Sequence, residues 1–290
     1  MNQNLKGIVL ITLSAVCFGS YGIWSRLMGA NFSDFSQAWI RGVLLVGLLL
    51  PVGLFAHKLR PICKSDLKWF IAISVAGGFN QAPYFLAFQK LPIGTATLLF
   101  YAALTIGGYL MGKLFLNEKI DLNKYVSLIL ALIGMYCIFT FSLSWSQIWP
   151  ALMAILAGLM GGIEVALTKK ISNNYSGIQI LLFIFSTMLI GNGLISWLNG
   201  DSVPQISFTI PWLALLGYTL AIFLAMFFVV WGFKYIQASV GSLIGLTEIL
   251  FALIFGVIFF GEIIDWSTVL GASLILIAAG LPYIKNKSTN

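Results

Sequence analysis

Two ten-residue stretches, about half a chain apart, share one sequence pattern. Residues 112–121 read GKLFLNEKID and residues 256–265 read GVIFFGEIID, so both fit the pattern G-x-x-F-x-x-E-x-I-D. The offset between them is 144 residues in a chain of 290, and weaker similarity continues on either side at nearly the same offset. The sequence therefore predicts two copies of one structural unit, residues 1–144 and residues 145–290.

Composition indicates that the chain lies in a membrane. Hydrophobic residues make up 60% of it and charged residues 9%, whereas a soluble domain carries about 25% charged residues. The net charge of +7 would suggest a nucleic-acid partner for a soluble protein. Here the basic residues lie between apolar runs, so membrane topology explains them better and we expect no nucleic-acid partner. A duplicated, very apolar chain is typical of transporters built from internal repeats.

Ten apolar stretches of roughly 20 residues are each long enough for a bilayer core of roughly 30 Å. The sequence therefore predicts an all-α membrane protein with ten transmembrane helices, five in each half. The predicted spans are residues 7–28, 35–56, 67–88, 92–112, 122–141, 147–168, 177–198, 209–232, 238–260 and 264–284.

The distribution of lysine and arginine predicts that both termini lie in the cytoplasm. With that orientation, 13 of the 16 basic residues fall in cytoplasmic segments, while Arg26 and Lys90 lie outside and Arg41 lies within the second span. Because each half has five spans, the second half must enter the membrane from the opposite side. The first copy of the repeated motif carries Lys113 and Lys119, and the second copy carries no basic residue. This difference supports an inverted repeat.

Four parts of the sequence carry a family resemblance: residues 17–26 (CFGSYGIWSR), the intramembrane Arg41, and residues 88–121 and 233–265. In these parts the chain resembles the drug/metabolite transporter superfamily, specifically its bacterial ten-span EamA-type members. The resemblance implies a secondary transporter of the bacterial inner (cytoplasmic) membrane. Its substrate would be a small organic metabolite, with amino acids or related compounds as the leading class. Inverted repeats imply alternating access around a site near the membrane midplane.

A charge at the bilayer centre costs roughly 3 kcal/mol or more, so each intramembrane charge needs a reason. Glu248 lies in the ninth predicted span, where it could bind a cationic group, carry a proton or form a structural hydrogen bond. Family members often have proline after this glutamate, but this chain has Ile249, so no proline-made break is expected. Glu164 could face a cavity or reach the interface beside Lys169. Arg41 could bind a substrate carboxylate, lock helices together or reach lipid headgroups.

Uncharged polar residues predict further parts of a cavity wall. Asn80 and Gln81 lie deep in the third span and are followed by Pro83 and Tyr84. Proline frees a backbone carbonyl and permits a bend, even within a membrane helix. We expect this segment to form a polar notch in the wall of the cavity.

Aromatic residues on the first and fourth spans are further candidates. Tyr101 shares one helix face with Thr97 and Thr105, because the three are spaced by four residues. This stripe could line a cavity or serve ordinary hydrogen bonding between helices. Tyr21 and Trp24 could line the cavity or belong to an aromatic belt, and the belt is favoured for Trp24 because it lies near the external surface.

Other features are expected to be structural. The repeated Glu118 and Glu262 lie at span ends, where they could cap the following helix or bind across the halves. Small residues four positions apart predict close helix packing. These pairs are Gly158/Gly162, Gly108/Gly112 and Gly241/Gly245.

The sequence gives no sign of catalysis or of a bound cofactor. Residues 107–113 (GGYLMGK) resemble a phosphate-binding loop, but Leu114 follows where serine or threonine is needed, and the stretch lies in a membrane helix. The single histidine, His57, has no metal-binding partners, and the three scattered cysteines are expected to be free thiols. No nucleophile–base pair is visible. We therefore expect no enzyme activity, no metal and no cofactor.

The sequence thus predicts a secondary transporter whose halves rock around a site lined by spans 1, 3, 4, 6, 8 and 9. Its expected partners are a small-molecule substrate and the lipid bilayer, and its expected state is a monomer or weak homodimer. The sequence leaves open whether protons are a further partner; Glu248 is the candidate proton carrier. An alternative is efflux of cationic amines or drugs, because Glu248 and Glu164 give the inner spans more acid than base. A non-transporting membrane scaffold or sensor is an alternative of another class.

Overall fold

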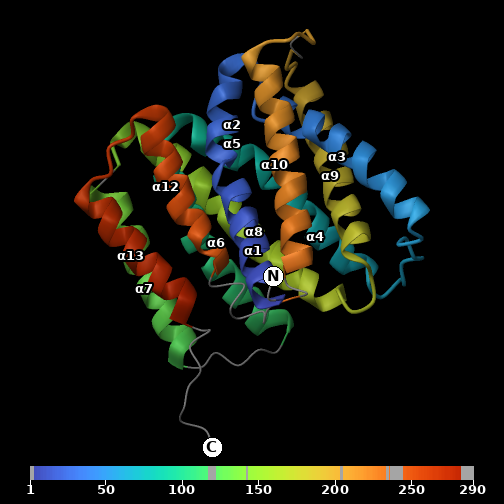
Figure 1. Ribbon diagram of the computed structural model, residues 1–290, viewed down its shortest axis with the longest axis horizontal. Helices are drawn as coiled ribbons and strands as arrows, with labels where there is room; N and C mark the ends of the chain where they lie inside the picture. Colours follow the sequence, from blue (N-terminus) through green and yellow to red (C-terminus); the bar gives the residue numbers. More distant parts are fainter. Residues whose placement is uncertain are drawn as a thin grey trace, which may run out of the picture.

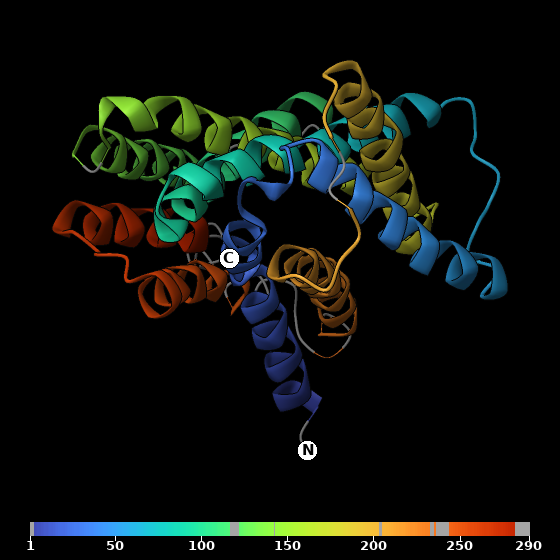
Figure 2. The same cartoon turned by 90° about the horizontal axis from the view of Figure 1, so that it is seen from above.

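The computed structural model is a bundle of helices, seen from two directions in Figures 1 and 2. It describes residues 3–116, 122–141, 143–202, 205–232, 235 and 244–281. These described residues form α-helices, two short 3-10 helices and no strand. Among them, six helical segments are long and apolar enough to cross a membrane, and shorter helices lie at the positions of the other four predicted spans. This all-helical architecture confirms the predicted fold class.

The first repeat contributes five of these segments, two of which consist of two consecutive helices. Its helices are α1 (Gln3–Gly19), α2 (Tyr21–Met28), η1 (Gly29–Asn31), α3 (Ser36–Phe55), α4 (Leu67–Phe79), α5 (Gln81–Lys90), α6 (Ile93–Phe115) and α7 (Leu122–Phe141). The second repeat contributes the other five. Its helices are η2 (Trp145–Gln147), α8 (Ile148–Ile171), α9 (Gly177–Leu198), α10 (Ile210–Gly232), α12 (Thr247–Phe260) and α13 (Trp266–Gly280).

The helix pairs follow the symmetry of an inverted repeat. α6 packs on α8, and the corresponding helices α12 and α1 also pack together. α7 pairs with α13 and α3 pairs with α9, each joining one segment to its own counterpart in the other repeat. The two repeats are therefore interleaved along their length, so a cavity between them is lined by both.

The third segment is interrupted at Asn80, between α4 and α5. Pro83 lies in the first turn of α5 and has no N–H to donate to the carbonyl of Phe79, four residues earlier. Helical hydrogen bonding resumes where Tyr84 N donates to Asn80 O at 3.2 Å, and Gln81 Nε2 donates to Asn80 Oδ1 at 2.6 Å. The interruption agrees with the bend predicted at Pro83, and it leaves two side-chain amides in the interior of the bundle.

α6 and α8 approach so closely that their backbones are in contact. A Cβ atom added at Gly158 would lie 2.2 Å from Phe100 O, and one added at Gly162 would lie 2.5 Å from Leu104 O. Only glycine leaves room for this approach at both positions. The predicted packing role of the Gly158/Gly162 pair is confirmed.

Gly158→Ala is expected to lower the free energy of unfolding by about 3 kcal/mol, because the added methyl group meets a backbone oxygen that cannot move without displacing α6. Thermal unfolding of the detergent-purified protein should show a clearly lower midpoint. Gly108→Ala is the matched control on the same helix pair, since a Cβ atom there has no neighbour within 4 Å. Equal losses in the two variants would contradict this account of the packing.

The other predicted glycine pairs behave differently. A Cβ atom added at Gly108 or Gly245 would have no neighbour within 4 Å, so neither position itself requires glycine. Gly108 nevertheless takes part in the close contact of α6 with α8, because its backbone N would lie 2.6 Å from a Cβ atom added at Gly162. Gly241, Glu118 and the start of the ninth predicted span lie outside the described residues.

Candidate functional site

A cavity of about 230 Å³ lies in the middle of the bundle between the two repeats. Its lining comes from the first, third, fourth, sixth, eighth and ninth segments, as predicted, and also from α9 of the seventh segment, which was not predicted. The polar part of the lining consists of Tyr21, Asn80, Gln81, Tyr84, Tyr101, Glu164 and Glu248. Seven of the nine predicted site residues therefore lie in one cavity.

Glu248 is held in the first turn of α12, with 8% of its surface exposed. Its carboxylate accepts a hydrogen bond from the Tyr101 hydroxyl of α6. Among the described residues this is the one side-chain donor that Glu248 has, while an ionised carboxylate offers about four acceptor positions. The remaining acceptor capacity faces the cavity, where a cationic group or a proton can meet it.

Glu164 of α8 also faces this cavity. Asn80 Nδ2 donates to its carboxylate at 3.3 Å, and Asn80 Oδ1 in turn accepts from Gln81 Nε2. A bonded chain of polar groups therefore runs from α5 to α8 across the cavity wall. The alternative in which Glu164 extends to the interface beside Lys169 is wrong, because the carboxylate points inward to Asn80.

Arg41 is fully buried in α3 but lies behind the cavity wall rather than in it. Its guanidinium donates to both the backbone and side-chain oxygens of Gln37 and, at 3.4 Å, to Gln81 Oε1. The guanidinium carbon lies 3.9 Å from the ring centroid of Tyr218 on α10, a cation–π contact. Of the three predicted alternatives, this placement matches the joining of helices. Arg41 does not reach lipid headgroups.

Of the aromatic candidates, the tyrosines line the cavity and Trp24 does not. Tyr84 lies in the wall and stacks on Phe100, with ring centroids 4.3 Å apart, and Tyr21 packs against Tyr218 at 4.7 Å. Trp24 is not part of the lining. Its indole Nε1 donates to a serine one turn earlier, and its ring fills the space that Gly217 leaves on α10. Trp24 is therefore a packing residue at a helix contact.

Sequence reasoning did not identify the apolar part of the cavity wall. This part includes Phe18, Leu104, Val165, Ile184, Phe185, Ile222 and Met226. A membrane helix is apolar on the side facing lipid as well as on the side facing its neighbours, so hydrophobic periodicity does not separate the two. Polar residues were the available signal, and α9 contributes apolar side chains alone to the wall.

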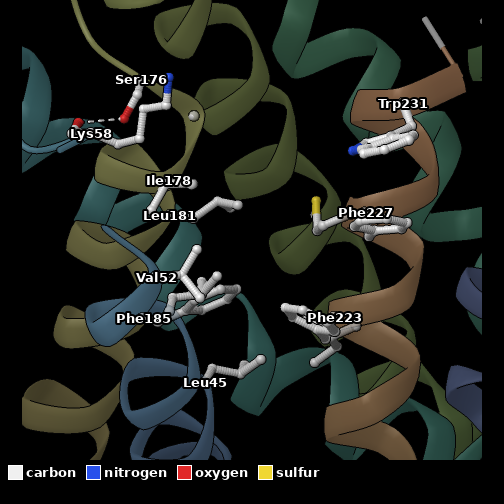
Figure 3. Close-up of a pocket in the computed structure, with 14 residues that line it drawn as sticks. Leu45, Val52, Lys58, Ser176, Ile178, Leu181, Phe185, Phe223, Phe227 and Trp231 are labelled. Carbon is white, nitrogen blue, oxygen red and sulfur yellow. Dashed lines mark hydrogen bonds between the residues drawn. The ribbon is translucent and has the colours of Figure 1, made fainter. Parts of the chain in front are cut away.

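An apolar groove of about 550 Å³ continues from the cavity (Figure 3). Cavity and groove share the lining residues Leu181, Phe185, Ile222 and Met226. The groove separates α10 on one side from α3 and α9 on the other, and it ends beside Lys58. We call this end of the bundle the Lys58 end. The cavity is thus continuous with a passage toward the Lys58 end.

The groove lies where the two repeats depart from symmetry. α4 packs tightly on α9, as shown by Asn192 Nδ2 donating to Gly78 O at 2.9 Å and by Phe79 filling the space at Gly191. The corresponding helices α10 and α3 meet near the contact of Arg41 with Tyr218 and are separated by the groove beyond it. The pair α4–α9 is therefore closed while its counterpart α10–α3 is apart, and the bundle is open toward the Lys58 end.

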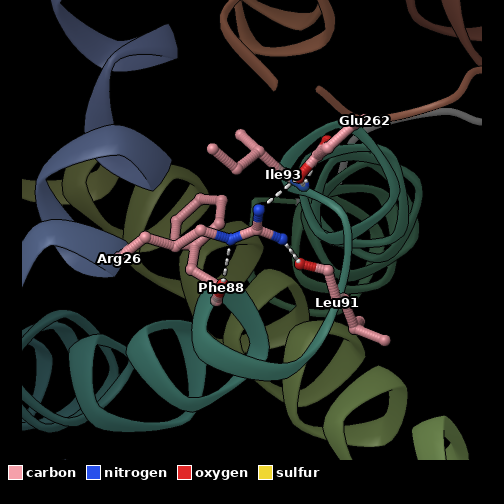
Figure 4. A network of polar contacts seen from close by, with 5 residues as sticks. All are labelled: Arg26, Phe88, Leu91, Ile93 and Glu262. Atoms are coloured by element: carbon pink, nitrogen blue, oxygen red, sulfur yellow. Dashed lines mark hydrogen bonds and ion pairs between the residues drawn. The ribbon is translucent and has the colours of Figure 1, made fainter. Parts of the chain in front are cut away.

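The opposite end, which we call the Arg26 end, is closed by polar contacts (Figure 4). Arg26 forms an ion pair of 2.7 Å with Glu262 and donates hydrogen bonds to the carbonyl oxygens of Phe88, at 3.0 Å, and Leu91. Ile93 N donates to both carboxylate oxygens of Glu262, at 2.8 and 2.9 Å. These five residues, which we call the Arg26–Glu262 lock, join the second repeat to the first.

The lock decides between the two roles predicted for Glu262. Its carboxylate accepts from the first N–H of α6, which belongs to the other repeat. The following helix, α13, is capped instead by Asp265, whose Oδ1 accepts from Thr268 N at 2.8 Å. Glu262 therefore binds across the halves. Glu118, its counterpart in the first repeat, lies outside the described residues.

A second contact at the Arg26 end joins the loop before α3 to the loop after α9 and to the first turn of α10. The Ser33 hydroxyl donates to Asp201 Oδ2, and Phe32 packs edge-to-face on Trp212 with ring centroids 5.2 Å apart. Burial, together with the charge of Asp201, raises the pKa of Asp34 from 3.8 to about 6, and Lys90 opposes this rise. Ionisation of the Asp34 carboxyl is therefore unfavourable at this buried position beside Asp201.

The raised pKa of Asp34 predicts how the stability of the fold changes with pH. Because its pKa in the folded protein is raised, protonated Asp34 favours the fold below about pH 4, and this contribution is lost as pH rises through about 6. Asp34→Asn is therefore expected to unfold at a higher temperature than the wild type at pH 7.5 and at the same temperature at pH 4. Thermal unfolding of both proteins across this range measures the difference. A difference that grows as pH falls would contradict the prediction.

No group of three or more histidine, cysteine, aspartate or glutamate side chains close enough to hold a metal ion occurs in the described part of the chain. Cys17, Cys63 and Cys137 are free thiols. The chemistry available in the cavity is therefore that of two carboxylates, two side-chain amides and three tyrosine hydroxyls.

Comparisons with known proteins agree with this architecture. The EamA-like transporter family matches residues 5–140 and again residues 148–283. Two proteins of Helicobacter pylori strains, each named an uncharacterized transporter, are 25% and 27% identical to the chain. Each alignment covers 95% of this chain and 93% of the relative. An uncharacterized transporter of Archaeoglobus fulgidus is 23% identical, covering 93% of both chains.

One solved crystal structure has the same fold. It superposes with a TM-score of 0.65, covering 95% of this chain and 96% of the other, at 12% sequence identity. Because the family matches once in each half and together spans most of the sequence, the resemblance predicted from the sequence is confirmed. The chain is a multi-pass membrane protein and a member of the EamA-like transporter family, within the drug/metabolite transporter superfamily.

Proposed function

We propose that this transporter moves a small organic molecule with a protonated amino group across the membrane by alternating access. One observation carries this proposal: two carboxylates, Glu248 and Glu164, face a single central cavity, and no described basic residue lines it. An anionic substrate would meet uncompensated negative charge there, whereas a protonated amine gains a charge-assisted hydrogen bond.

Cationic amines are the substrate class that this geometry supports best. Arg41, the residue that could have bound a substrate carboxylate, lies behind Gln81 and is already engaged by Gln37 and Tyr218. Amino acids, the leading class from the family resemblance, are the second candidate. The side-chain amide of Asn80 can donate to a carboxylate, and Tyr84 and Phe100 give an aromatic wall for an apolar side chain.

One end of the helix bundle is closed and the other is open, and this difference supports a transport cycle by alternating access. The Arg26–Glu262 lock closes one end while the groove connects the cavity to the other. From the distribution of basic residues we infer that the Lys58 end faces the cytoplasm, with both termini on that side of a bacterial inner membrane. This conformation is then the inward-facing one. In the outward-facing conformation each repeat would adopt the conformation that the other repeat has here. That change closes α10 onto α3 and releases the Arg26–Glu262 lock.

Proton coupling follows from the same cavity. Glu248 can hold either a proton or an ammonium group, because both compete for the same carboxylate oxygens. A cycle in which a proton displaces the substrate from Glu248 would exchange one for the other across the membrane. The monomeric or weakly dimeric state and the lack of a nucleic-acid partner remain predictions from the sequence.

A thermal-shift screen of detergent-purified protein tests the substrate class. The ligands are polyamines, quaternary amines, amino acids and nucleotide-sugars. A ligand at 100 times its dissociation constant adds about 2.7 kcal/mol of stability, so a substrate should raise the unfolding midpoint clearly. Stabilisation by cations supports the amine class, and stabilisation by neutral amino acids alone supports the second candidate. Stabilisation by nucleotide-sugars alone would contradict both, and no stabilisation by any member of the screen would support a scaffold or sensor.

A further inference from the structure

We propose that the groove and a basic pocket beside it bind an anionic phospholipid, with an acyl chain in the groove and the phosphate in the pocket. The pocket, about 260 Å³ in volume, lies at the Lys58 end and includes His57, Lys58, Arg60 and Asn174 in its lining. We call it the basic cup. The cup and the groove share Lys58 and Ser176, so the apolar and polar spaces are continuous. Figure 3 shows these two side chains where the groove ends.

The groove has the character of a binding site for hydrocarbon. Apart from its end at Lys58 and Ser176, its lining is apolar, from Leu45 and Phe223 to Trp231. It also reaches the outer surface of the bundle, since Val52 and Phe227 in its wall are 44% and 42% exposed. In a protein that spans a membrane, such a surface meets lipid tails rather than water.

The basic cup is fixed in shape by hydrogen bonds between the loop after α3 and the start of α9. Ser176 Oγ donates to Lys58 O at 2.7 Å. Gln179 forms a reciprocal pair with the Arg60 backbone, accepting from its N–H at 3.1 Å and donating to its carbonyl at 2.7 Å. Cys63 N donates to the Tyr175 hydroxyl at 3.0 Å. The backbone positions of Lys58 and Arg60 are therefore set before any ligand binds.

The backbone at the end of α3 adds to this arrangement. His57 has φ 50°, in the left-handed region that glycine usually occupies at this position of a helix end. Lys58 N donates back to Gly53 O at 3.0 Å and His57 N to Leu54 O at 3.1 Å, which completes the Schellman motif. The chain is thereby reversed within two residues, so Lys58 lies beside the open groove.

The charge of the basic cup fits an anionic headgroup. In the described part of the chain, neither the Lys58 ammonium nor the Arg60 guanidinium forms an ion pair. One carboxylate lies nearby, that of Asp66, and it accepts a hydrogen bond from the Tyr175 hydroxyl at 2.9 Å. Basic pockets between helices on the cytoplasmic side bind anionic headgroups. Lys58 and Arg60 can therefore bind the phosphate of a lipid whose tail enters the groove.

A lipid at this position would also affect transport. Its acyl chain lies between α3 and α10, the helix pair that must close for the outward-facing state. Lipid occupancy would therefore keep α3 and α10 apart and would also fill the passage that leads from the cavity to the Lys58 end. This consequence and the cytoplasmic placement of the basic cup rest on the proposed function, whereas the fit of a lipid to the groove and the cup does not depend on it.

Native mass spectrometry of the full chain, with phosphatidylglycerol and phosphatidylcholine of matched acyl chains, tests the proposal. One phosphatidylglycerol is expected to be retained per chain in preference to phosphatidylcholine. Because each basic residue contributes about a fivefold factor, the double variant Lys58→Ala/Arg60→Ala should bind it about 30-fold more weakly. Lys64→Ala is the matched control, since this exposed lysine of the same loop lies outside the cup. Equal retention of the two lipids, or equal weakening by Lys64→Ala, would overturn the proposal.

A second pair of variants tests the groove with the cup intact. Val52→Trp should fill the groove and lower phosphatidylglycerol retention at least tenfold, whereas Leu48→Trp, equally exposed on α3 but outside the groove, should leave retention unchanged. Soluble glycerol phosphate distinguishes a lipid from a free phosphate. If it binds the cup as tightly as the lipid does, or if Val52→Trp has no effect, the site is not one for a lipid.

Discussion

Replacing Glu248 by glutamine is expected to weaken the binding of a cationic amine about 100-fold. Glutamine keeps the size of the side chain and an oxygen that accepts the Tyr101 hydrogen bond, but it removes the negative charge. Removing one partner of a buried, hydrogen-bonded charge pair costs about 2–5 kcal/mol, and about 2.8 kcal/mol corresponds to a factor of 100 in affinity. Titration calorimetry of wild type and variant with an amine found in the thermal-shift screen measures the change.

Tyr101→Phe provides the comparison for this prediction. It keeps the charge of Glu248 and removes one neutral hydrogen-bond donor, so we expect less than a tenfold loss of affinity. A zwitterionic substrate should respond less to Glu248→Gln than a cation does. Unchanged cation binding by a folded Glu248→Gln protein would show that this carboxylate does not bind the ammonium group.

Replacing Glu262 by alanine is expected to open the Arg26 end. The variant loses the ion pair with Arg26 and both hydrogen bonds from Ile93 N, and it leaves the partly buried Arg26 without its carboxylate. Contacts of this kind contribute about 3 kcal/mol together. If they exist in the inward-facing state alone, their loss should raise the outward-facing population more than 100-fold.

Cysteine labelling from the Arg26 side measures this population. In a protein whose three native cysteines have been replaced, Leu104→Cys places a thiol in the cavity wall. A membrane-impermeant thiol reagent should label it much faster in the Glu262→Ala background. Asp265→Ala is the control, because it removes the cap of α13 at the same end and leaves the lock intact. Equal labelling rates with and without Glu262→Ala would contradict its role in closing this end.

The architecture was predictable because membrane insertion leaves strong marks on a sequence. Apolar runs gave the positions of the spans. Their direction across the membrane, inferred from the asymmetry of basic residues, stays a prediction. The repeated motif at residues 112–121 and 256–265 revealed the duplication. The polar part of the cavity was also predictable, because Glu248, Asn80 and Tyr101 have little reason to lie inside a membrane unless they face one another or a substrate.

What the sequence left open was the direction in which side chains point. Glu164 and Arg41 were both compatible with inward and outward positions, and the packing of α8 and α3 decided between them. The Arg26–Glu262 lock joins residues far apart in the chain, and its partner groups on Phe88, Leu91 and Ile93 are backbone atoms that carry no side-chain signal. The groove that separates α10 from α3 is lined by apolar side chains, which the sequence does not distinguish from side chains that face lipid.

Counterflow in proteoliposomes tests the central claim, alternating access around Glu248 and Glu164, most directly. Vesicles loaded with an unlabelled amine found in the thermal-shift screen receive the same amine, labelled, outside at low concentration. An alternating-access transporter should accumulate the label transiently above its equilibrium level, and Glu248→Gln should abolish this overshoot. Label entry that only approaches equilibrium, or an overshoot of equal size in Glu248→Gln, would contradict the account.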